Sequence, residues 1–323
     1  MDKKFTVSAS PHVRSNKTSS GIMLDVIIAL MPALIASVII FGIRSLAVTA
    51  ICVAFSVASE YVTRKILKRS TCIGDLSAVV TGLLLAFNLP VTIPLWMAAI
   101  GAVFAIVVVK QFFGGIGQNF VNPAIAGRIV LLVSFPGAMS HWTEAFAWKQ
   151  GSVTDAITTA TPLSAIANDG ELPTLLDMFL GKRAGCIGET CILALLIGFV
   201  YLVVRKIIKP VIPLVFIGTV AVFMLIYGKG DFEYMLYELL SGGLFLGAIF
   251  MATDYTTSPI SMKGKIIFAV GCGLITSVIR LFGSLPEGVS YSIIVMNIVT
   301  PLIDRWTLPK PFGTVKSKEE KAV

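Results

Sequence analysis

The sequence has few charged side chains. Asp, Glu, Lys and Arg make up 14% of the 323 residues, whereas hydrophobic residues make up 56%. A soluble domain usually carries about 25% charged residues. Because charge is depleted while apolar content is raised, lipid rather than water is the expected surrounding of most of the chain. We therefore expect one membrane domain and not two soluble domains.

Histidine and paired cysteine are also scarce, which argues against two kinds of redox centre. His12 and His141 are the two histidines, and neither lies in an apolar run, where a membrane haem would need its axial ligands. The five cysteines contain no C-x-x-C pair of the kind that binds zinc or iron–sulfur clusters. Cys186 and Cys191 form a C-x4-C spacing, but the other thiols lie far away along the chain. We expect the cysteines to be small residues within helices and expect no metal site.

The formal net charge of +8 does not indicate nucleic-acid binding. The basic residues cluster between apolar runs, as the loop charges of a membrane protein do. They do not form a soluble module with interleaved aromatic residues, which nucleic-acid binding would require. A lipid membrane is therefore the expected surrounding, and no nucleic-acid partner is expected.

Apolar runs of the length that crosses a bilayer, about 20 residues, predict an all-α polytopic membrane protein with about ten transmembrane helices. The expected spans are 22–42, 46–62, 75–89, 94–110, 122–135, 187–204, 211–227, 238–253, 265–282 and 290–304. With the N-terminus in the cytoplasm, most of the 26 Lys and Arg residues fall on the cytoplasmic side, as the positive-inside rule requires. The predicted location is the bacterial inner membrane, with both termini cytoplasmic.

A weak internal similarity divides the chain into two five-helix halves. The segment 81–85 (TGLLL) resembles 241–246 (SGGLFL), and Asn122-Pro123 has its counterpart in Asn297 and Pro301. Because five is an odd number, two such halves would lie in the membrane with opposite polarity, as an inverted repeat. The expected organisation is a cytoplasmic segment 1–21, a first half 22–135, an outward loop 136–186, a second half 187–304 and a cytoplasmic tail 305–323.

The outward loop contains the stretch 155–161, DAITTAT. It resembles the flavin-attachment motif D-x-x-[ST]-[GS]-A-T of the Rnf and Nqr families, whose last threonine is esterified by the phosphate of FMN. Asp155, Thr158, Ala160 and Thr161 match this motif, whereas Thr159 replaces the usual Gly or Ser. An acceptor hydroxyl that a modifying enzyme must reach belongs in a loop with small neighbours. The other interpretation of these residues alone is a threonine that caps a short helix.

Other segments extend the resemblance from about residue 8 to residue 306, in the same order along the chain. They are 10–12 (SPH), 114–124 (GGIGQNFVNPA), 250–259 (FMATDYTTSP), 283–288 (GSLPEG), and the pairs Met296-Asn297 and Pro301 to Asp304. Together these segments are specific. The chain resembles the D-subunit family of Rnf complexes and, more distantly, the B subunit of the sodium-pumping NADH:quinone reductase.

This resemblance implies an electron-carrying subunit of a complex that couples electron flow between reduced ferredoxin and NAD⁺ to Na⁺ or H⁺ movement. It implies FMN on Thr161, attached by a flavin transferase, and a second, non-covalent flavin such as riboflavin. The implied partners are the A, B, C, E and G subunits, above all the flavin-bearing G subunit. The expected environment of a flavin comprises Gly114, Gly115, Asn119, Asn122 and Arg128. The cofactor would carry out the redox chemistry, so no catalytic residue set is expected of the chain, and the enzymatic activity belongs to the assembly.

Charged residues within expected spans are costly and often functional. The candidates are Asp25, Asp75, Arg128, Asp254 and Asp304. Arg128 could pair with a carboxylate such as that of Asp304, contact a flavin, or contact a neighbouring subunit, and the sequence does not choose among these. Inverted repeats and helices broken by glycine also occur in channels and secondary transporters. A channel- or transporter-like subunit without a redox role, or a scaffold subunit, is therefore the alternative function.

Overall fold

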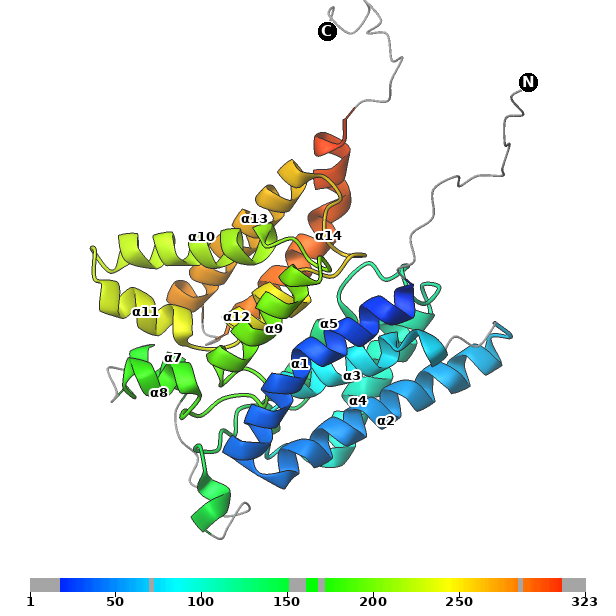
Figure 1. The fold of residues 1–323 in the computed structure, drawn as a ribbon, viewed down its shortest axis with the longest axis horizontal. Helices are drawn as coiled ribbons and strands as arrows, with labels where there is room; N and C mark the ends of the chain where they lie inside the picture. The colour runs from blue at the N-terminus through cyan, green and yellow to red at the C-terminus, as the bar shows by residue number, and fades with distance from the viewer. Residues whose placement is uncertain (1–17, 70–72, 151–160, 168–171, 284–286, 310–323) are drawn as a thin grey trace, which may run out of the picture.

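The computed structural model describes residues 18–69, 73–150, 161–167, 172–283 and 287–309, which form helices and no strands (Figure 1). The all-α class is therefore confirmed for these residues. The first group of helices comprises α1 (Ser19–Phe41), α2 (Ile43–Ile66), α3 (Ser77–Phe87), α4 (Leu95–Phe104) and α5 (Pro123–Ser134). A 3₁₀ turn, η1 (Ile73–Asp75), precedes α3, and α4 continues as the π-helix η2 (Ala105–Gln111).

The second group comprises α9 (Ile192–Val204), α10 (Val211–Tyr227), α11 (Phe232–Leu240), α12 (Leu244–Leu246), α13 (Met262–Phe282) and α14 (Val289–Thr307). The π-helix η4 (Gly247–Met251) continues α12. Four short elements connect the two groups: α6 (Pro136–Met139), η3 (Ala147–Gln150), α7 (Pro162–Ala167) and α8 (Leu175–Leu180). In Figure 1 the groups form two lobes, which meet where α9 packs beside α1.

Nine of the ten expected spans each overlap a single α-helix, but these helices differ in length. Among the described residues, α1, α2 and α13 are long and apolar enough to cross a bilayer by themselves. A fourth candidate is the pair α11 and α12–η4, which bends by 66° at residues 241–243. The expected eighth span, 238–253, is thus divided in the structure. The number of spans stays a prediction.

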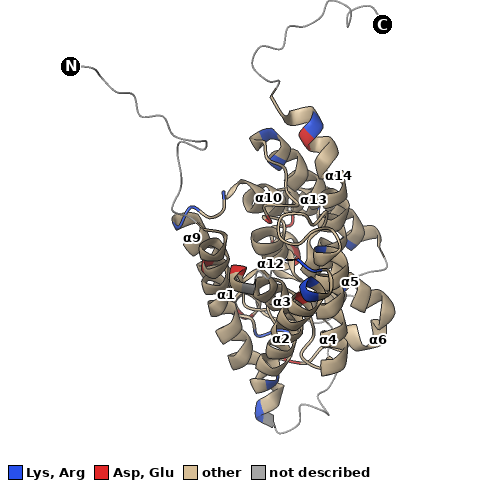
Figure 2. Ribbon diagram, turned by 90° about the vertical axis from the view of Figure 1, so that its right-hand side faces the viewer, with Lys and Arg blue, Asp and Glu red and all other residues tan. Residues whose placement is uncertain are grey.

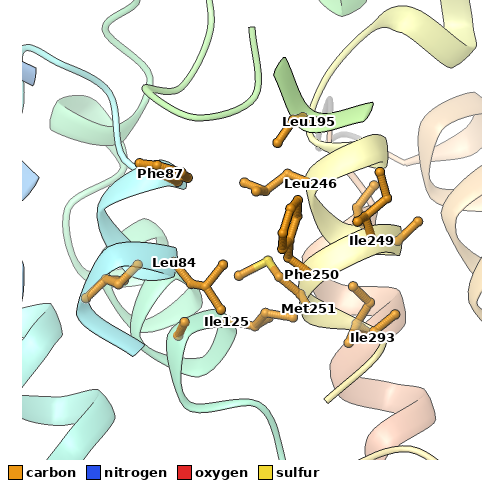
Figure 3. Close-up of a cluster of buried hydrophobic side chains, with 14 of the residues drawn as sticks. Leu84, Phe87, Ile125, Leu195, Leu246, Ile249, Phe250, Met251 and Ile293 are labelled. Carbon is orange, nitrogen blue, oxygen red and sulfur yellow. The ribbon is translucent and has the colours of Figure 1, made fainter. Parts of the chain in front are cut away.

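Two short helices from different lobes meet in the interior (Figure 3). Leu84 and Phe87 on α3 lie opposite Phe250 and Met251 on η4, and Ile125 from α5 lies below them. All five are buried. In contrast, many large apolar side chains on the long helices are exposed, among them Ile35 and Ile39 on α1 and Ile226 on α10. This inside–outside pattern is the one expected of a bundle surrounded by lipid, because lipid tails are as apolar as leucine.

Candidate functional site

A pocket of about 290 Å³ opens between the start of α1, the start of α3 and the end of α9. Its walls are mainly apolar and include Ile22, Met23 and Leu84. The polar residues that line it are Ser19, Ser77, Thr81, Lys110, Asn119, Asn122, Thr253, Asp254, Tyr255 and Thr256. Apolar walls with a few convergent polar groups are typical of cofactor pockets.

A buried ion pair lies at one wall of this pocket. Lys110 on η2 is 3% exposed, and its Nζ lies 2.9 Å from Glu60 Oε1 on α2. The same ammonium donates to Ser77 Oγ at 2.6 Å, and Gln111 Nε2 donates to Glu60 Oε1 at 2.5 Å. Arg64 completes the cluster through Gln111 Oε1 at 3.3 Å. Each of these side chains belongs to the first group of helices.

The glycine-rich segment 114–117 connects this cluster to α5. Gly114, Gly115 and Gly117 have φ angles of 129°, 105° and 83°, a region that residues with a Cβ rarely adopt. The chain therefore leaves the helical conformation here and then enters α5 through Asn122. The Asn122 side chain accepts from the N–H of Ala124 at 3.0 Å, so it is the N-cap of α5.

Polar side chains from both groups of helices meet on the opposite wall. Asp254 Oδ2 accepts from Thr256 Oγ1 at 2.9 Å and from Asn119 Nδ2 at 3.4 Å. Asn122 Nδ2 donates to the Met251 carbonyl at 3.1 Å. Of the five residues expected around a flavin, Asn119 and Asn122 thus line one pocket together. Gly114 and Gly115 do not line this pocket, and Gly115 packs against the Arg64 guanidinium.

Arg128, the fifth expected residue, lies away from the pocket in a second buried cluster. Its Nη1 donates to Asn88 Oδ1 at 2.9 Å and to Ser290 Oγ at 3.1 Å. Both guanidinium Nη atoms also donate to Glu287. Of the alternatives left open by the sequence, Arg128 therefore pairs with a carboxylate, that of Glu287 rather than that of Asp304. This pair joins the two groups of helices.

The same cluster supports the break between α11 and α12. Arg183 donates to the Leu240 carbonyl, and Arg280 donates to the carbonyls of Glu238 at 2.6 Å and Ser241 at 3.0 Å. On the other side of the break, Glu287 Oε1 accepts from the N–H of Gly243 at 3.1 Å. A helix that breaks in a membrane must have its freed backbone groups satisfied by other parts of the protein. Three charged side chains do so here.

The remaining charged candidates lie near helix ends. Asp25 pairs with Arg205, with 3.2 Å between Oδ1 and Nη2, and accepts from the Tyr201 hydroxyl at 2.8 Å. Asp75 accepts from the N–H of Ser77 at 2.9 Å, at the start of α3. Asp304 accepts from the N–H of Ile260 at 3.1 Å. These contacts fix helix ends.

Thr161 directly precedes the short helix α7 and is partly exposed. Its Oγ1 accepts from the N–H of Ser164 at 3.3 Å, and Ser164 Oγ donates back to the Thr161 carbonyl at 2.8 Å. Thr161 therefore caps the first turn of α7. The other motif residues, Asp155, Thr158, Thr159 and Ala160, lie outside the described residues.

The connecting segment that leads toward Thr161 is attached to the turn between α1 and α2. Trp148 Nε1 donates to the Ile39 carbonyl at 3.3 Å, and the N–H of Phe146 donates to the Ile40 carbonyl at 2.9 Å. The turn itself is made by Gly42, at φ 78°, and the Trp148 ring packs directly over this glycine. A Cβ at residue 42 would lie 2.9 Å from the Trp148 ring.

Beyond Thr161, the segment includes α8, whose first turn is capped by Thr174. The Thr174 hydroxyl accepts from the N–H of Asp177 at 3.2 Å and donates to Asp177 Oδ2 at 2.7 Å. That hydrogen bond and Lys182, 3.1 Å from Asp177 Oδ1, hold the pKa of Asp177 below its usual value.

Comparison with known proteins agrees with the family resemblance that the sequence motifs indicated. Residues 6–313 match the model of the NQR2, RnfD, RnfE family. The chain belongs to this family. It is 50% identical over 320 residues to the D subunit of the Na⁺-translocating ferredoxin:NAD⁺ oxidoreductase complex of Acetobacterium woodii, covering 98% of each chain. It is 45% identical over 326 residues to the D subunit of the proton-translocating ferredoxin:NAD⁺ oxidoreductase complex of Clostridium ljungdahlii, covering 96% of each. The resemblance stated from the sequence is thus confirmed, and the chain is a membrane protein of the NQR2, RnfD, RnfE family.

For this family member, sequence reasoning missed the residues that make the buried ionic clusters. Glu60 and Lys110 lie at or near the ends of the expected spans 46–62 and 94–110, yet they are 1% and 3% exposed. Glu189 and Glu238 are also buried, and Glu287 was recognised only as part of a motif. Glu60 and Glu189 could have been recognised as candidates from the sequence, because each is a carboxylate within or beside an apolar run.

Two cysteines also differ from expectation. Cys186 lies in a loop and Cys191 is the N-cap residue of α9. The expectation that all cysteines lie within helices was therefore wrong for both, because their short spacing falls in the turn that leads into α9.

Proposed function

We propose that this chain is the membrane electron-carrier subunit of an ion-translocating ferredoxin:NAD⁺ oxidoreductase complex, with FMN bound covalently to Thr161. The observation that carries the proposal is the position of Thr161. It is the last residue of the attachment motif in a chain of this family, it is partly exposed, and it begins a helix in a segment between the two groups of helices. The names of the two bacterial relatives support the reaction and the ion coupling.

In this function the subunit accepts an electron at the FMN on Thr161 from the covalent flavin of the G subunit. The A, B, C and E subunits complete the complex, and a flavin transferase attaches the FMN. The phosphoester tether leaves the isoalloxazine ring free, so the protein sets the position and the environment of the ring while the flavin carries out the redox step. Whether Na⁺ or H⁺ is moved is left open by the relatives, since one is named for each ion.

The proposed topology has ten spans in two inverted halves, cytoplasmic termini, and the Thr161 segment on the outer side of the inner membrane. Two local features support the duplication. The short helices α3 and α12 each follow a residue in the left-handed region, Leu76 at φ 60° and Gly242 at φ 62°. Both helices are too short to cross a bilayer alone, and they meet in the interior (Figure 3). Discontinuous helices that meet at a repeat interface are typical of inverted-repeat membrane proteins.

The pocket at Asn119 and Asn122 is the proposed site of a second, non-covalent flavin. Its apolar walls suit a flat ring, and the two asparagine amides and the Lys110 ammonium could bind ring or ribityl oxygens. The chain therefore has one candidate flavin position at the Thr161 segment and another at this pocket.

Covalent attachment is tested by expressing the chain with a flavin transferase and viewing it under ultraviolet light after a denaturing gel. The parent band should fluoresce, and Thr161→Ala should be dark. Thr159→Gly is the matched control, because it restores the usual small residue of the motif and should keep the fluorescence. A dark parent band beside a labelled acceptor protein would show that Thr161 carries no covalent flavin. A channel- or transporter-like subunit or a scaffold subunit would then be the better proposal.

The non-covalent flavin is tested separately by extracting flavins from the purified complex. Asn119→Ala should lower the amount of extractable flavin without changing the fluorescence of the denatured band. Ser277→Ala is the control, because Ser277 is a buried polar residue of α13 that does not line the pocket. Equal extractable flavin in the parent and in Asn119→Ala would contradict this site.

A further inference from the structure

Glu189 is a buried carboxylate with one oxygen left without a partner. The residue is 5% exposed and lies in the turn just before α9. Its Oε1 accepts from the N–H of Cys186 at 3.0 Å. Among the described residues, no donor reaches Oε2, although this atom is fully buried. Keeping a negative charge there is costly, because a buried charge needs a partner to compensate for its lost hydration.

The free oxygen points toward a second carboxylate. A Cβ placed on Gly243 would lie 2.9 Å from Glu189 Oε2 and 2.6 Å from Glu287 Oε1, so the two oxygens flank the same backbone position. Glycine at residue 243 leaves the space in which they approach each other. Two carboxylates this close in a protein interior disfavour double ionisation.

The cations around Glu189 are engaged by other groups. Arg128 on α5 is paired with Glu287. Arg280 on α13 lies 3.3 Å from Glu238 on α11. Arg183, in the same loop as Glu189, donates to main-chain carbonyls, among them that of Glu189 itself at 2.8 Å. The hydrogen bonds of the three arginines in the described cluster thus leave the Glu189 carboxyl without an ionic partner.

We propose that Glu189 is a proton-binding site, which carries its proton on Oε2 at neutral pH and exchanges it with Glu287. Glu287 Oε1 lies beside the same Gly243 position as Glu189 Oε2, and the Glu287 side chain is 17% exposed, which gives water access to the pair. A metal cation suits the position less well, because the guanidinium groups of Arg128 and Arg183 belong to the same cluster and repel it.

The position of this site gives the proton a structural consequence. Glu189 precedes α9, Gly243 precedes α12, and Glu287 precedes α14, so one proton affects the contact among three segments. Loss of the proton places two negative charges on either side of Gly243 and weakens that contact. This inference concerns only the buried carboxyl and does not depend on the flavin at Thr161.

The test is infrared difference spectroscopy of the full chain in lipid, recorded as the pH is changed. The carbonyl band of a protonated buried carboxylic acid should be present at neutral pH, shift in D₂O, and be absent in Glu189→Gln. Glu238→Gln is the matched control, because Glu238 is equally buried but is paired with Arg280, and it should keep the band. A parent chain without this band, or a band that survives in Glu189→Gln, would overturn the proposal.

Thermal stability gives a second, independent readout. Glutamine resembles a protonated glutamate, so Glu189→Gln should leave the Tm at neutral pH unchanged, whereas Glu238→Gln should lower it. Failure of Glu189→Gln to fold would show that the charged form is needed and would overturn the proposal. Glu287→Gln removes the neighbouring negative charge, and the Glu189 band should then be lost at lower pH. Loss of the band on adding Na⁺ at constant pH would instead identify a sodium site.

Discussion

Two of the buried ion pairs among the described residues, Lys110–Glu60 and Arg128–Glu287, differ in what they hold together. Lys110 and Glu60 lie within the first group of helices, beside the pocket. Arg128 and Glu287 come from different groups, and their neighbours Asn88 and Ser290 likewise come one from each. Figure 2 shows most of the chain without charge and only a few charged positions inside the bundle. The first pair therefore stabilises one lobe, whereas the second fastens the two lobes to each other.

The pairs also differ in how many hydrogen-bond donors the carboxylate keeps when its cationic partner is removed. Without Lys110, Glu60 Oε1 would still accept from Gln111 Nε2 at 2.5 Å, and Arg64 would remain 4.0 Å away. Without Arg128, Glu287 would keep only the N–H of Gly243 among its described donors. Loss of the second pair should therefore have the larger effect, and four experiments test this comparison.

The largest effect is expected from Arg128→Met. It leaves the Glu287 carboxylate unpaired and removes the donor of Asn88 Oδ1 and Ser290 Oγ, so the free energy of unfolding should fall by about 3–5 kcal/mol. Reversible unfolding in mixed detergent measures it. The double variant Arg128→Met with Glu287→Leu should recover part of the loss, because no buried charge is left alone. A loss below about 1 kcal/mol for the single variant would mean that this pair does not fasten the lobes.

Lys110→Met should cost less, about 1–3 kcal/mol, because Glu60 keeps other donors. The same unfolding assay measures this loss of stability. The proteolytic sensitivity of the two lobes shows in addition which region each variant loosens. Loss of Lys110 should loosen α2 and η2, whereas loss of Arg128 should expose the junction between the lobes. If both variants produce the same cleavage pattern, the assignment of one pair to a single lobe is wrong.

Two glycine substitutions distinguish the cost of steric overlap from the cost of backbone strain in these regions. Gly243→Ala places a Cβ against both Glu189 and Glu287 and should cost about 1–3 kcal/mol through overpacking. Gly117→Ala meets no atom within 4 Å but has a φ of 83°, so its cost should be about 1–2 kcal/mol, from left-handed strain alone. Gly218→Ala, in α10 with open space and no positive φ, is the control and should be neutral or stabilising.

Much of the bundle was predictable because apolar runs and glycines carry local signals. The helices α1, α2, α10 and α13 lie where the hydrophobic runs placed them, and Asn122-Pro123 begins α5 as proline at a first turn should. The break at residues 241–243 was missed, because the sequence there resembles a continuous span and the arginines that satisfy the break lie far along the chain.

The ionic clusters were not predictable for a related reason. Arg128 was recognised as a charge within a span, but its partner follows it by 159 residues, and nothing in the sequence favours Glu287 over Asp304. Lys110 lies at the end of an apolar run, where a snorkelling side chain is the usual outcome. Its burial depends on Glu60 and Ser77, which approach it only after α2 and α3 pack.

The smallest expected effect comes from the exposed pair of Asp177 and Lys182 on α8 and just beyond it, which contrasts with both buried pairs. The Thr174 hydroxyl and Lys182 lower the pKa of Asp177 in the folded protein. The ionised carboxylate therefore stabilises α8 fully above the unfolded-state pKa of about 3.9. This stabilisation is lost as the pH falls through the lower pKa of Asp177 in the folded protein. Thr174→Val should raise the pKa of Asp177 toward its usual value and speed amide exchange within α8 at neutral pH. Added salt should weaken the contact with Lys182 but leave Arg128–Glu287 unaffected. Equal salt sensitivity of the two pairs would show that water reaches Arg128, and the Arg128–Glu287 pair would then contribute little to holding the lobes together.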